Sequence, residues 1–498
     1  MSGTHPPSSA AAEGPANPWP ALWALVVGFF MILVDVSIVS VATPALIREL
    51  DASITEVLWV TSAYALAYAV PLLITGRLGD RFGPKRLYLA GLSVFTLSSL
   101  ACGLSGSITE LVAARVIQGL GASMMTPQTM AIITRTFPVD RRGTAMSLWG
   151  ATAGAAFLVG PLLGGVLIDS AGWEWIFFVN IPVGVLGLLA AWRLVPDLPT
   201  SARTMDWLGI ALSAAGLTCL VFAIQEGEQF GWGVIAGPLS IPLLIAAGLA
   251  LLTTFVWWQS RVQPEPLVPL ALFADRNFTL SNVAVTVQGF AVNAMLFPLL
   301  VWLQTARQLT PSEAALVIAP QAVFSIILAP LVGRWIDRLH PRLLPSVGLL
   351  GFSATLFVLA AVMTPDSPLW LVVIVTCFIG ITGACIWGPL ATTANRNLPL
   401  RLAGAGSGVY NTTRQVGSTV GAAAIAAVMS ARLTAEAGPQ AASLAGGEGR
   451  SAGSASLPPE VVSGLSSAFS QSMLLPAAVV LIGAAAALGM EEMRHRRR

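Results

Sequence analysis

Long apolar segments separated by short polar connections dominate this chain. Each apolar segment holds close to the roughly 20 residues that an α-helix needs to cross the hydrocarbon core of a bilayer. The pattern therefore predicts an all-α membrane protein. Its fourteen spans are expected near residues 21–46, 57–76, 87–106, 110–134, 143–168, 175–195, 207–225, 236–258, 278–303, 313–333, 343–363, 368–394, 403–430 and 468–490. Polar residues interrupt the spans at 313–333 and 403–430, so these are the two places where a span is merged or split.

The composition supports a membrane protein and argues against other classes. Of 498 residues, 55% are hydrophobic and 10% are charged, whereas soluble domains carry about 25% charged residues. The mean hydropathy is +0.77. The net charge of +2 does not indicate nucleic-acid binding, and no basic tract interleaved with aromatic residues appears outside the last residues. The four cysteines lie in apolar segments without a Cys-x-x-Cys pair, so neither a disulfide framework nor a metal site is expected.

The distribution of lysine and arginine predicts the orientation in the plasma membrane. With the N-terminus inside, cytoplasmic segments hold 20 of the 26 Lys and Arg residues. Two more fall within spans, and the outer loops hold only Arg48, Arg307, Arg432 and Arg450. Because cytoplasmic loops carry the excess of positive charge, both termini are expected in the cytoplasm.

An internal repeat predicts the domain organisation. Gly333-Arg334-Trp335-Ile336-Asp337-Arg338, after the tenth span, repeats the pattern of Gly76-Arg77-Leu78-Gly79-Asp80-Arg81, after the second. Two matching six-helix halves around a central site are typical of secondary transporters. The expected domains are a disordered cytoplasmic tail (1–20), an N-terminal half (21–200), an inserted two-helix hairpin with spans seven and eight (201–262), a C-terminal half (263–490) with a long outer loop (431–466), and a basic cytoplasmic tail (491–498).

Several motifs resemble those of one transporter family. The loop from Gly76 to Arg86, with the pattern Gly-x-x-x-Asp-Arg-x-Gly followed by basic residues, resembles the loop signature of the major facilitator superfamily. Further stretches resemble its fourteen-spanner drug:proton antiporter branch, namely Leu33–Pro44, Arg115–Ala122, Gly160–Gly165, Trp173–Gly184 and Asn411–Gly417. One departure is Glu174, where that branch usually has a basic residue between two tryptophans.

The resemblance implies a major facilitator fold with a latch and a sealing segment. The latch residues would be Gly76, Asp80, Arg81, Gly83 and Arg86, with Asp80 held against the N-terminal end of the thirteenth span near Ala403. In the fifth span, the antiporter helix break would consist of Gly160, Pro161, Gly164 and Gly165 and would seal the protein against leak. The alternative for this segment is ordinary helix packing.

Asp35 is the acid placed deepest in any span, and it is the candidate proton carrier. An ionised carboxylate at the bilayer centre costs about 2.5–3.5 kcal/mol on insertion scales, so it should face a cavity or a partner. The alternative role is a structural hydrogen bond between helices. Arg115 is the candidate cation for proton coupling, although it could instead snorkel to the headgroups. If Asp35 is not the carrier, Glu313 is the next candidate.

Polar stripes on two spans predict the substrate cavity. On the fourth span, Arg115, Gln118, Thr126 and neighbouring small residues fall on one helix face. The thirteenth span carries a second stripe, where Arg414 could instead pair with backbone carbonyls. The candidate cavity residues are Gln118, Thr126, Asn411, Arg414 and Gln415. Aromatic residues that could stack on a lipophilic substrate include Tyr64, Tyr68, Phe290, Phe297, Trp302 and Trp387, although most are expected in the core or at the interface.

No motif indicates catalysis or ATP binding, since histidines lie in tails or loops and no phosphate-binding loop is present. The prediction is therefore not an enzyme but a proton-driven antiporter. It would export lipophilic or amphiphilic drugs or antibiotics as a monomer, powered by the proton motive force without a cofactor or metal. The alternatives are a dedicated exporter of a self-made secondary metabolite, an uptake symporter, and a membrane receptor that does not transport.

Overall fold

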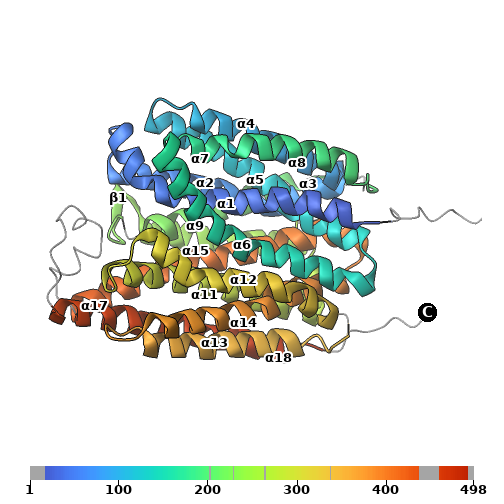
Figure 1. The fold of residues 1–498 in the computed structure, drawn as a ribbon. Helices are drawn as coiled ribbons and strands as arrows, with labels where there is room; N and C mark the ends of the chain where they lie inside the picture. The colour runs from blue at the N-terminus through green and yellow to red at the C-terminus, as the bar shows by residue number, and fades with distance from the viewer. Residues whose placement is uncertain are drawn as a thin grey trace, which may run out of the picture.

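The computed structural model describes residues 17–200, 204–227, 229–262, 265–336, 338–436 and 459–491. The described part is almost entirely helical, and its long helices run side by side in a bundle (Figure 1). Residues 1–16 and 492–498 of the two predicted tails, residues 437–458 of the predicted outer loop, and Asp337 of the second repeat lie outside the described residues.

The helices fall into three consecutive groups. The N-terminal group contains α1 (Trp19–Glu49), α2 (Ile54–Ala69), α3 (Leu72–Phe82), α4 (Pro84–Gly103), α5 (Ile108–Thr136), α6 (Val139–Ala171), α7 (Trp175–Phe178) and α8 (Asn180–Leu194). The middle group contains α9 (Trp207–Glu226), β1 (Val234–Ala236), β2 (Leu239–Ser240) and α10 (Ile241–Arg261). The C-terminal group contains η1 (Leu270–Ala274), α11 (Arg276–Thr305), α12 (Pro311–Ile336), α13 (Leu343–Val362), α14 (Leu369–Arg396), η2 (Leu400–Leu402), α15 (Ala403–Glu436), α17 (Pro459–Ser472) and α18 (Leu474–Leu488).

The N-terminal and C-terminal groups lie against each other along two seams. In Figure 1 the blue to teal helices form the upper part of the bundle and the yellow to red helices the lower part. At the α6–α12 seam, α6 packs on α12 and α14, and at the α3–α15 seam, α3 and α5 pack on α15. The helices α9 and α10 pack on each other, and α9 also contacts α2 and α15. Most of the α10 surface therefore faces outward from the bundle.

The membrane-spanning character is confirmed, whereas the count of fourteen is matched only in part. Within the described residues, twelve helices are long and apolar enough to cross a membrane. The pair α2 and α3 makes a thirteenth if it is counted as one span bent by 46°. The bend falls at Pro71, and a proline inside a helical stretch removes a backbone hydrogen bond. The helix α5 is not among the twelve.

Two local predictions are wrong. The span predicted at 236–258 begins later, because β1 and β2 pair as a short antiparallel hairpin and Ser240 caps α10. The suspected interruptions at 313–333 and 403–430 do not occur, since α12 and α15 run unbroken. Polar side chains inside a membrane helix can satisfy themselves on its own carbonyls, as Asn411 does by donating to the Ser407 carbonyl at 2.9 Å.

The described chain begins and ends at the same end of the bundle, on the right in Figure 1. The start of α1 lies there because Trp19 contacts Phe137, next to the loop that joins α5 and α6. We call this the arginine-rich end, since it also holds Arg135, Arg141 and Arg334. The opposite end carries the β1–β2 hairpin.

Candidate transport site

Asp35 and Arg115 form an ion pair in the interior of the N-terminal group. Asp35 lies at the middle of α1 and Arg115 in the first third of α5, and both side chains are 0% exposed. Arg115 Nη1 lies 2.5 Å from Asp35 Oδ2. A buried charge is tolerated when it is paired and hydrogen-bonded, and this contact gives each residue a counter-ion. Arg115 therefore does not snorkel to the surface.

Further donors complete the environment of the Asp35 carboxylate. Its Oδ1 accepts hydrogen bonds from Gln118 Nε2 at 2.9 Å and from Asn180 Nδ2 at 3.1 Å. Arg115 in turn donates to Gln118 Oε1 at 2.7 Å and to the Val60 carbonyl at 3.1 Å. Both carboxylate oxygens of Asp35 therefore accept hydrogen bonds from neighbouring side chains. Protonation of Asp35 would leave the Arg115 charge without its counter-ion.

Asn180 is a member of this cluster that the sequence did not single out. It begins α8, is 3% exposed, and also donates to Ser99 Oγ at 3.0 Å. Ser99 donates onward to the Phe177 carbonyl at 3.0 Å. The available signal was its position inside the stretch Trp173–Gly184, where it is a polar residue at the start of an apolar helix. Asn180 links the connection between α7 and α8 to the buried acid.

A separate polar contact at Tyr68 joins the N-terminal group of helices to the C-terminal group. The Tyr68 hydroxyl lies 3.2 Å from Thr126 Oγ1 on α5, and it accepts a hydrogen bond from Arg414 Nη2 on α15 at 3.2 Å. The ring of Tyr68 stacks near that of Tyr64, whose ring lies 3.9 Å below the Arg115 guanidinium. A continuous line of contacts therefore runs from Asp35 in the N-terminal group to Arg414 in the C-terminal group.

The five predicted cavity residues make separate sets of contacts in this conformation. Gln118 is bound to Asp35, whereas Thr126 and Arg414 meet at Tyr68. Asn411 is 0% exposed and lies against the Met130 sulfur, and Gln415 is half-buried. A stripe on one helix fixes which face points inward, but the neighbouring helices decide which side chains meet. The two stripes meet where Thr126 and Arg414 both contact the Tyr68 hydroxyl.

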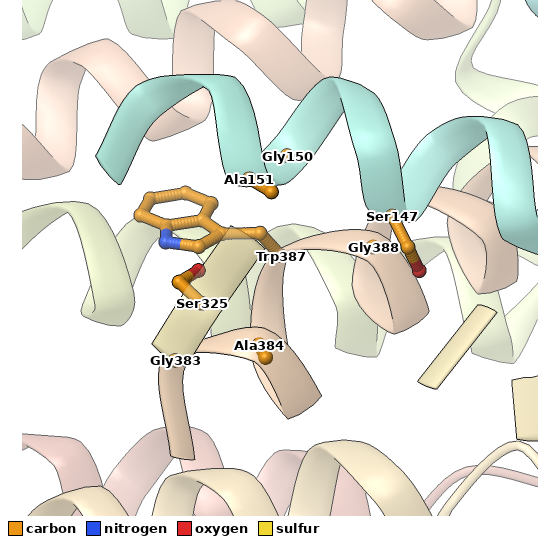
Figure 2. A pocket seen from close by; sticks show the side chains of 8 residues that line it. All are labelled: Ser147, Gly150, Ala151, Ser325, Gly383, Ala384, Trp387 and Gly388. Carbon is orange, nitrogen blue, oxygen red and sulfur yellow. The ribbon is translucent and has the colours of Figure 1, made fainter. Parts of the chain in front are cut away.

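A narrow crevice lies on the α6–α12 seam (Figure 2). The residues that line it are Ser147, Gly150, Ala151, Ser325, Gly383, Ala384, Trp387 and Gly388. In Figure 2 the Trp387 indole lies between the α6 backbone and Ser325. A Cβ atom at Gly150 would stand 2.9 Å from the Trp387 Cβ, so a larger residue there would push the seam apart. Among the other predicted aromatic candidates, Trp302 is buried in the core and Phe297 is exposed on the outside of the bundle.

At the arginine-rich end, Asp80 closes the α3–α15 seam. The side chain is 1% exposed and accepts hydrogen bonds from the backbone amides of Gly404 at 3.2 Å and Ala405 at 3.1 Å. These amides belong to the first turn of α15, where unsatisfied donors and the helix dipole favour a negative charge. Asp80 also pairs with Arg135 Nη2 at 2.5 Å, a partner on α5 that the sequence did not suggest.

Of the other predicted latch residues, two are glycines that shape the backbone here, and two are arginines that do not contact Asp80. A Cβ atom at Gly76 would stand 2.6 Å from the Gly404 carbonyl, so only glycine permits this approach of α3 to α15. Gly83 has a φ of +98° and separates α3 from α4. Arg81 and Arg86 take no part in the Asp80 contact. Both are exposed, and Arg81 lies over the Phe82 ring instead.

The predicted helix break at Gly160 and Pro161 is wrong. The helix α6 runs unbroken from Val139 to Ala171 with Pro161 inside it. Membrane helices tolerate proline because neighbouring groups and small adjustments compensate for the missing hydrogen bond. Gly160 and Gly164 are packing sites against α1, since added Cβ atoms would stand 1.9 Å from Ser37 Oγ and 2.8 Å from Ile38 Cγ1. Gly165 has no neighbour within 4 Å of such an atom.

We expect Gly164→Leu to impair transport by forcing α6 away from the helix that carries Asp35. The leucine side chain would collide with Ile38, three residues along α1 from Asp35. Gly165→Leu is the matched control, because its position has open space. The measurement is the initial transport rate in proteoliposomes at equal protein. Equal rates for both variants would show that the close packing of Gly164 on α1 is not needed for transport.

A bundle of membrane-crossing helices in two groups that meet along two seams, with a buried ion pair, has the architecture of a secondary transporter. Comparison with known families agrees with this class. A family model described as Major Facilitator Superfamily matches residues 25–422. The chain belongs to the major facilitator superfamily, and it is a multi-pass membrane protein.

Relatives include transporters with resistance phenotypes in their names. The uncharacterized MFS-type transporter Rv1250 of Mycobacterium tuberculosis is 48% identical, over 95% of this chain and 81% of its own. The tetracenomycin C resistance and export protein of Streptomyces glaucescens is 33% identical, over 86% and 80%. Multidrug resistance protein Stp of M. tuberculosis is 36% identical, over 83% and 76%.

The fold also matches a solved transporter structure. The proton:xylose symporter XylE superposes with a TM-score of 0.62, covering 92% of this chain and 94% of XylE. The sequence identity is 13%, so this likeness supports the fold alone.

Proposed function

We propose that this protein exports lipophilic or amphiphilic drugs across the cytoplasmic membrane by antiport with protons. The observation that carries the proposal is the fully buried Asp35–Arg115 pair. Burying an ionisable acid inside a membrane bundle costs free energy, and such residues are usually present because they have a function. The names of the tetracenomycin C and Stp relatives support the class of substrate. No cofactor enters the proposal, since the proton motive force supplies the energy, and the monomer is the proposed transport unit.

In the proposed cycle, Asp35 alternates between a charged and a neutral form. The charged form is held by Arg115, Gln118 and Asn180. A proton arriving from outside neutralises Asp35 and releases Arg115, so the contacts between α1 and α5 weaken. Drug entering from the cytoplasm favours the deprotonated form. Reciprocal linkage then requires that drug binding release a proton.

The proposed topology has fourteen spans with both termini in the cytoplasm. The helix α5 is 29 residues long and packs between α2 and α4, so it is long enough to cross the bilayer. Its low hydropathy follows from Arg115, Gln118 and other polar residues that are buried away from lipid. With an even number of crossings, a chain begins and ends on the same side of the membrane, and the two described ends do lie at the same end of the bundle. The pair α9 and α10 would be the hairpin inserted between halves 21–200 and 263–490.

A second candidate is the export of one metabolite made by the producing cell. The relative named for tetracenomycin C resistance and export favours it, because that name couples export with resistance to a single compound. The geometry of the buried pair serves either substrate range. The two candidates differ in the number of compounds that the protein exports.

A toxicity panel in an efflux-deficient host tests the proposal. We expect the wild-type chain to raise the inhibitory concentration several-fold for more than one lipophilic or amphiphilic compound, and Asp35→Asn to raise none. Resistance to one compound alone would favour the dedicated exporter. No change for any compound, with the protein present in the membrane, would contradict drug export.

A further inference from the structure

A basic pocket opens at the arginine-rich end of the α6–α12 seam. Its volume is about 350 Å³. The lining residues are Trp19, Asp140, Arg141, Thr144, Pro330, Arg334 and Arg338. The pocket therefore gathers three guanidinium groups and one carboxylate from α1, α6 and the end of α12. It is separate from the Asp35 cluster and from the Trp387 crevice.

The positive charge of this pocket is not neutralised within the described chain. Arg334 and Arg338 make no side-chain hydrogen bond or ion pair with any residue that the structure describes. Arg141 reaches Asp140 only at 4.0 Å, and both side chains are well exposed, so this pair contributes little. Arg141 on α6 and Arg334 on α12 therefore place like charges on the two sides of the seam.

The opposite seam shows how the fold closes a similar junction. The repeated glycines occupy matching positions, since a Cβ at Gly333 would stand 2.4 Å from the Thr144 Cα and one at Gly76 would stand 2.6 Å from the Gly404 carbonyl. At the α3–α15 seam the buried carboxylate of Asp80 neutralises the charge. The matching residue of the second repeat, Asp337, lies outside the described residues. The described part of the α6–α12 seam is left with an excess of cations.

We propose that this pocket binds a phosphate-bearing anion, supplied by the headgroup of an acidic phospholipid or by a soluble phosphate. Planar guanidinium groups bind phosphate oxygens in pairs, which suits Arg141, Arg334 and Arg338. Basic pockets between helices at the cytoplasmic side suit lipid headgroups. Trp19 lines the pocket at the start of α1, and tryptophan is enriched at headgroup depth.

The bound anion bridges the two groups of helices. A phosphate between Arg141 and Arg334 replaces their mutual repulsion by two attractive contacts across the seam. It therefore stabilises the conformation in which the arginine-rich end is closed. Acidic phospholipid content would then set how readily this end opens, independently of which drug is carried.

Binding is measured on the purified full chain by native mass spectrometry and by thermal stability. The probes are phosphatidylglycerol, phosphatidylcholine and inorganic phosphate. The test variant is Arg334→Gln with Arg338→Gln, and the control is Arg193→Gln, an exposed arginine at the end of α8 outside the pocket. We expect the wild type and the control to bind an anionic probe, and the test variant to bind it at least about tenfold more weakly for the lost charge-assisted contacts.

The pattern among probes identifies the source of the phosphate. Stabilisation by phosphatidylglycerol but not by inorganic phosphate assigns the site to a lipid, and the reverse assigns it to a soluble anion. Asp337→Asn tests whether that residue neutralises the pocket itself. If neither anion binds the wild type while both bind Asp337→Asn, the proposal is overturned. Equal binding by wild type and the double arginine variant would also overturn it.

Discussion

Replacing Asp35 by asparagine is expected to abolish drug accumulation driven by a pH gradient. Asparagine is similar in size but cannot lose or gain a proton in the working range of pH. The Arg115 guanidinium would lose its counter-ion, and the protein would lose the group whose charge changes during the cycle. Exchange of drug across equal concentrations needs no proton and should continue in Asp35→Asn.

The experiment compares both modes of transport in the same proteoliposomes. Accumulation is measured with an imposed pH gradient, and counterflow is measured without one. Asp169→Asn is the matched control, because Asp169 is exposed near the end of α6 and has no ion pair within the described residues. Accumulation by Asp35→Asn at the rate of the control would show that Asp35 does not couple transport to protons.

Asp80→Asn is expected to lower turnover by about tenfold or more while leaving membrane insertion intact. The change removes the ion pair with Arg135 and weakens two hydrogen bonds from the start of α15. Breaking a buried pair costs about 3–5 kcal/mol, and each 1.4 kcal/mol is a tenfold change in population. The conformation with a closed arginine-rich end therefore becomes rare, and the cycle slows.

The control for this prediction keeps the same substitution at the same end of the bundle. Asp197 pairs with Lys85 at 3.5 Å, but its side chain is 79% exposed, so Asp197→Asn should leave turnover unchanged. Turnover is measured as substrate efflux per protein, together with the amount of protein in the membrane. Wild-type turnover by Asp80→Asn would remove the latch role from the α3–α15 seam.

Much of the fold could be predicted from the sequence because the bilayer imposes a length and polarity on every span. The acid Asp35 also stood out, since a carboxylate inside an apolar segment is rare. Helical periodicity placed Arg115 and Gln118 on an inward face. Their contact with Asp35 depends on how α1 and α5 lie in space, and periodicity within one helix carries no such information.

Other features depend on tertiary packing and were beyond the sequence. The sequence did not place Asn180 beside Asp35 or Tyr68 beside Arg414, yet each joins helices that are distant in sequence. Pro161 suggested a broken helix, but its surroundings keep α6 continuous. Gly160 and Gly164 were expected in that helix break, and they pack against α1 within the N-terminal group. In a sequence, glycine and proline can indicate either close packing of two helices or a distorted helix. Which of the two occurs depends on the neighbouring helix.

Drug-induced proton release tests the coupling role of Asp35 most directly. Purified protein in detergent and weak buffer receives drug, and the released protons are followed with a pH indicator for the wild type and for Asp35→Asn. The account predicts release by the wild type and none by the variant. Equal release by both would contradict it. The carrier would then be sought elsewhere, starting with Glu313, which is exposed and accepts a hydrogen bond from the Thr310 amide at 2.8 Å at the start of α12.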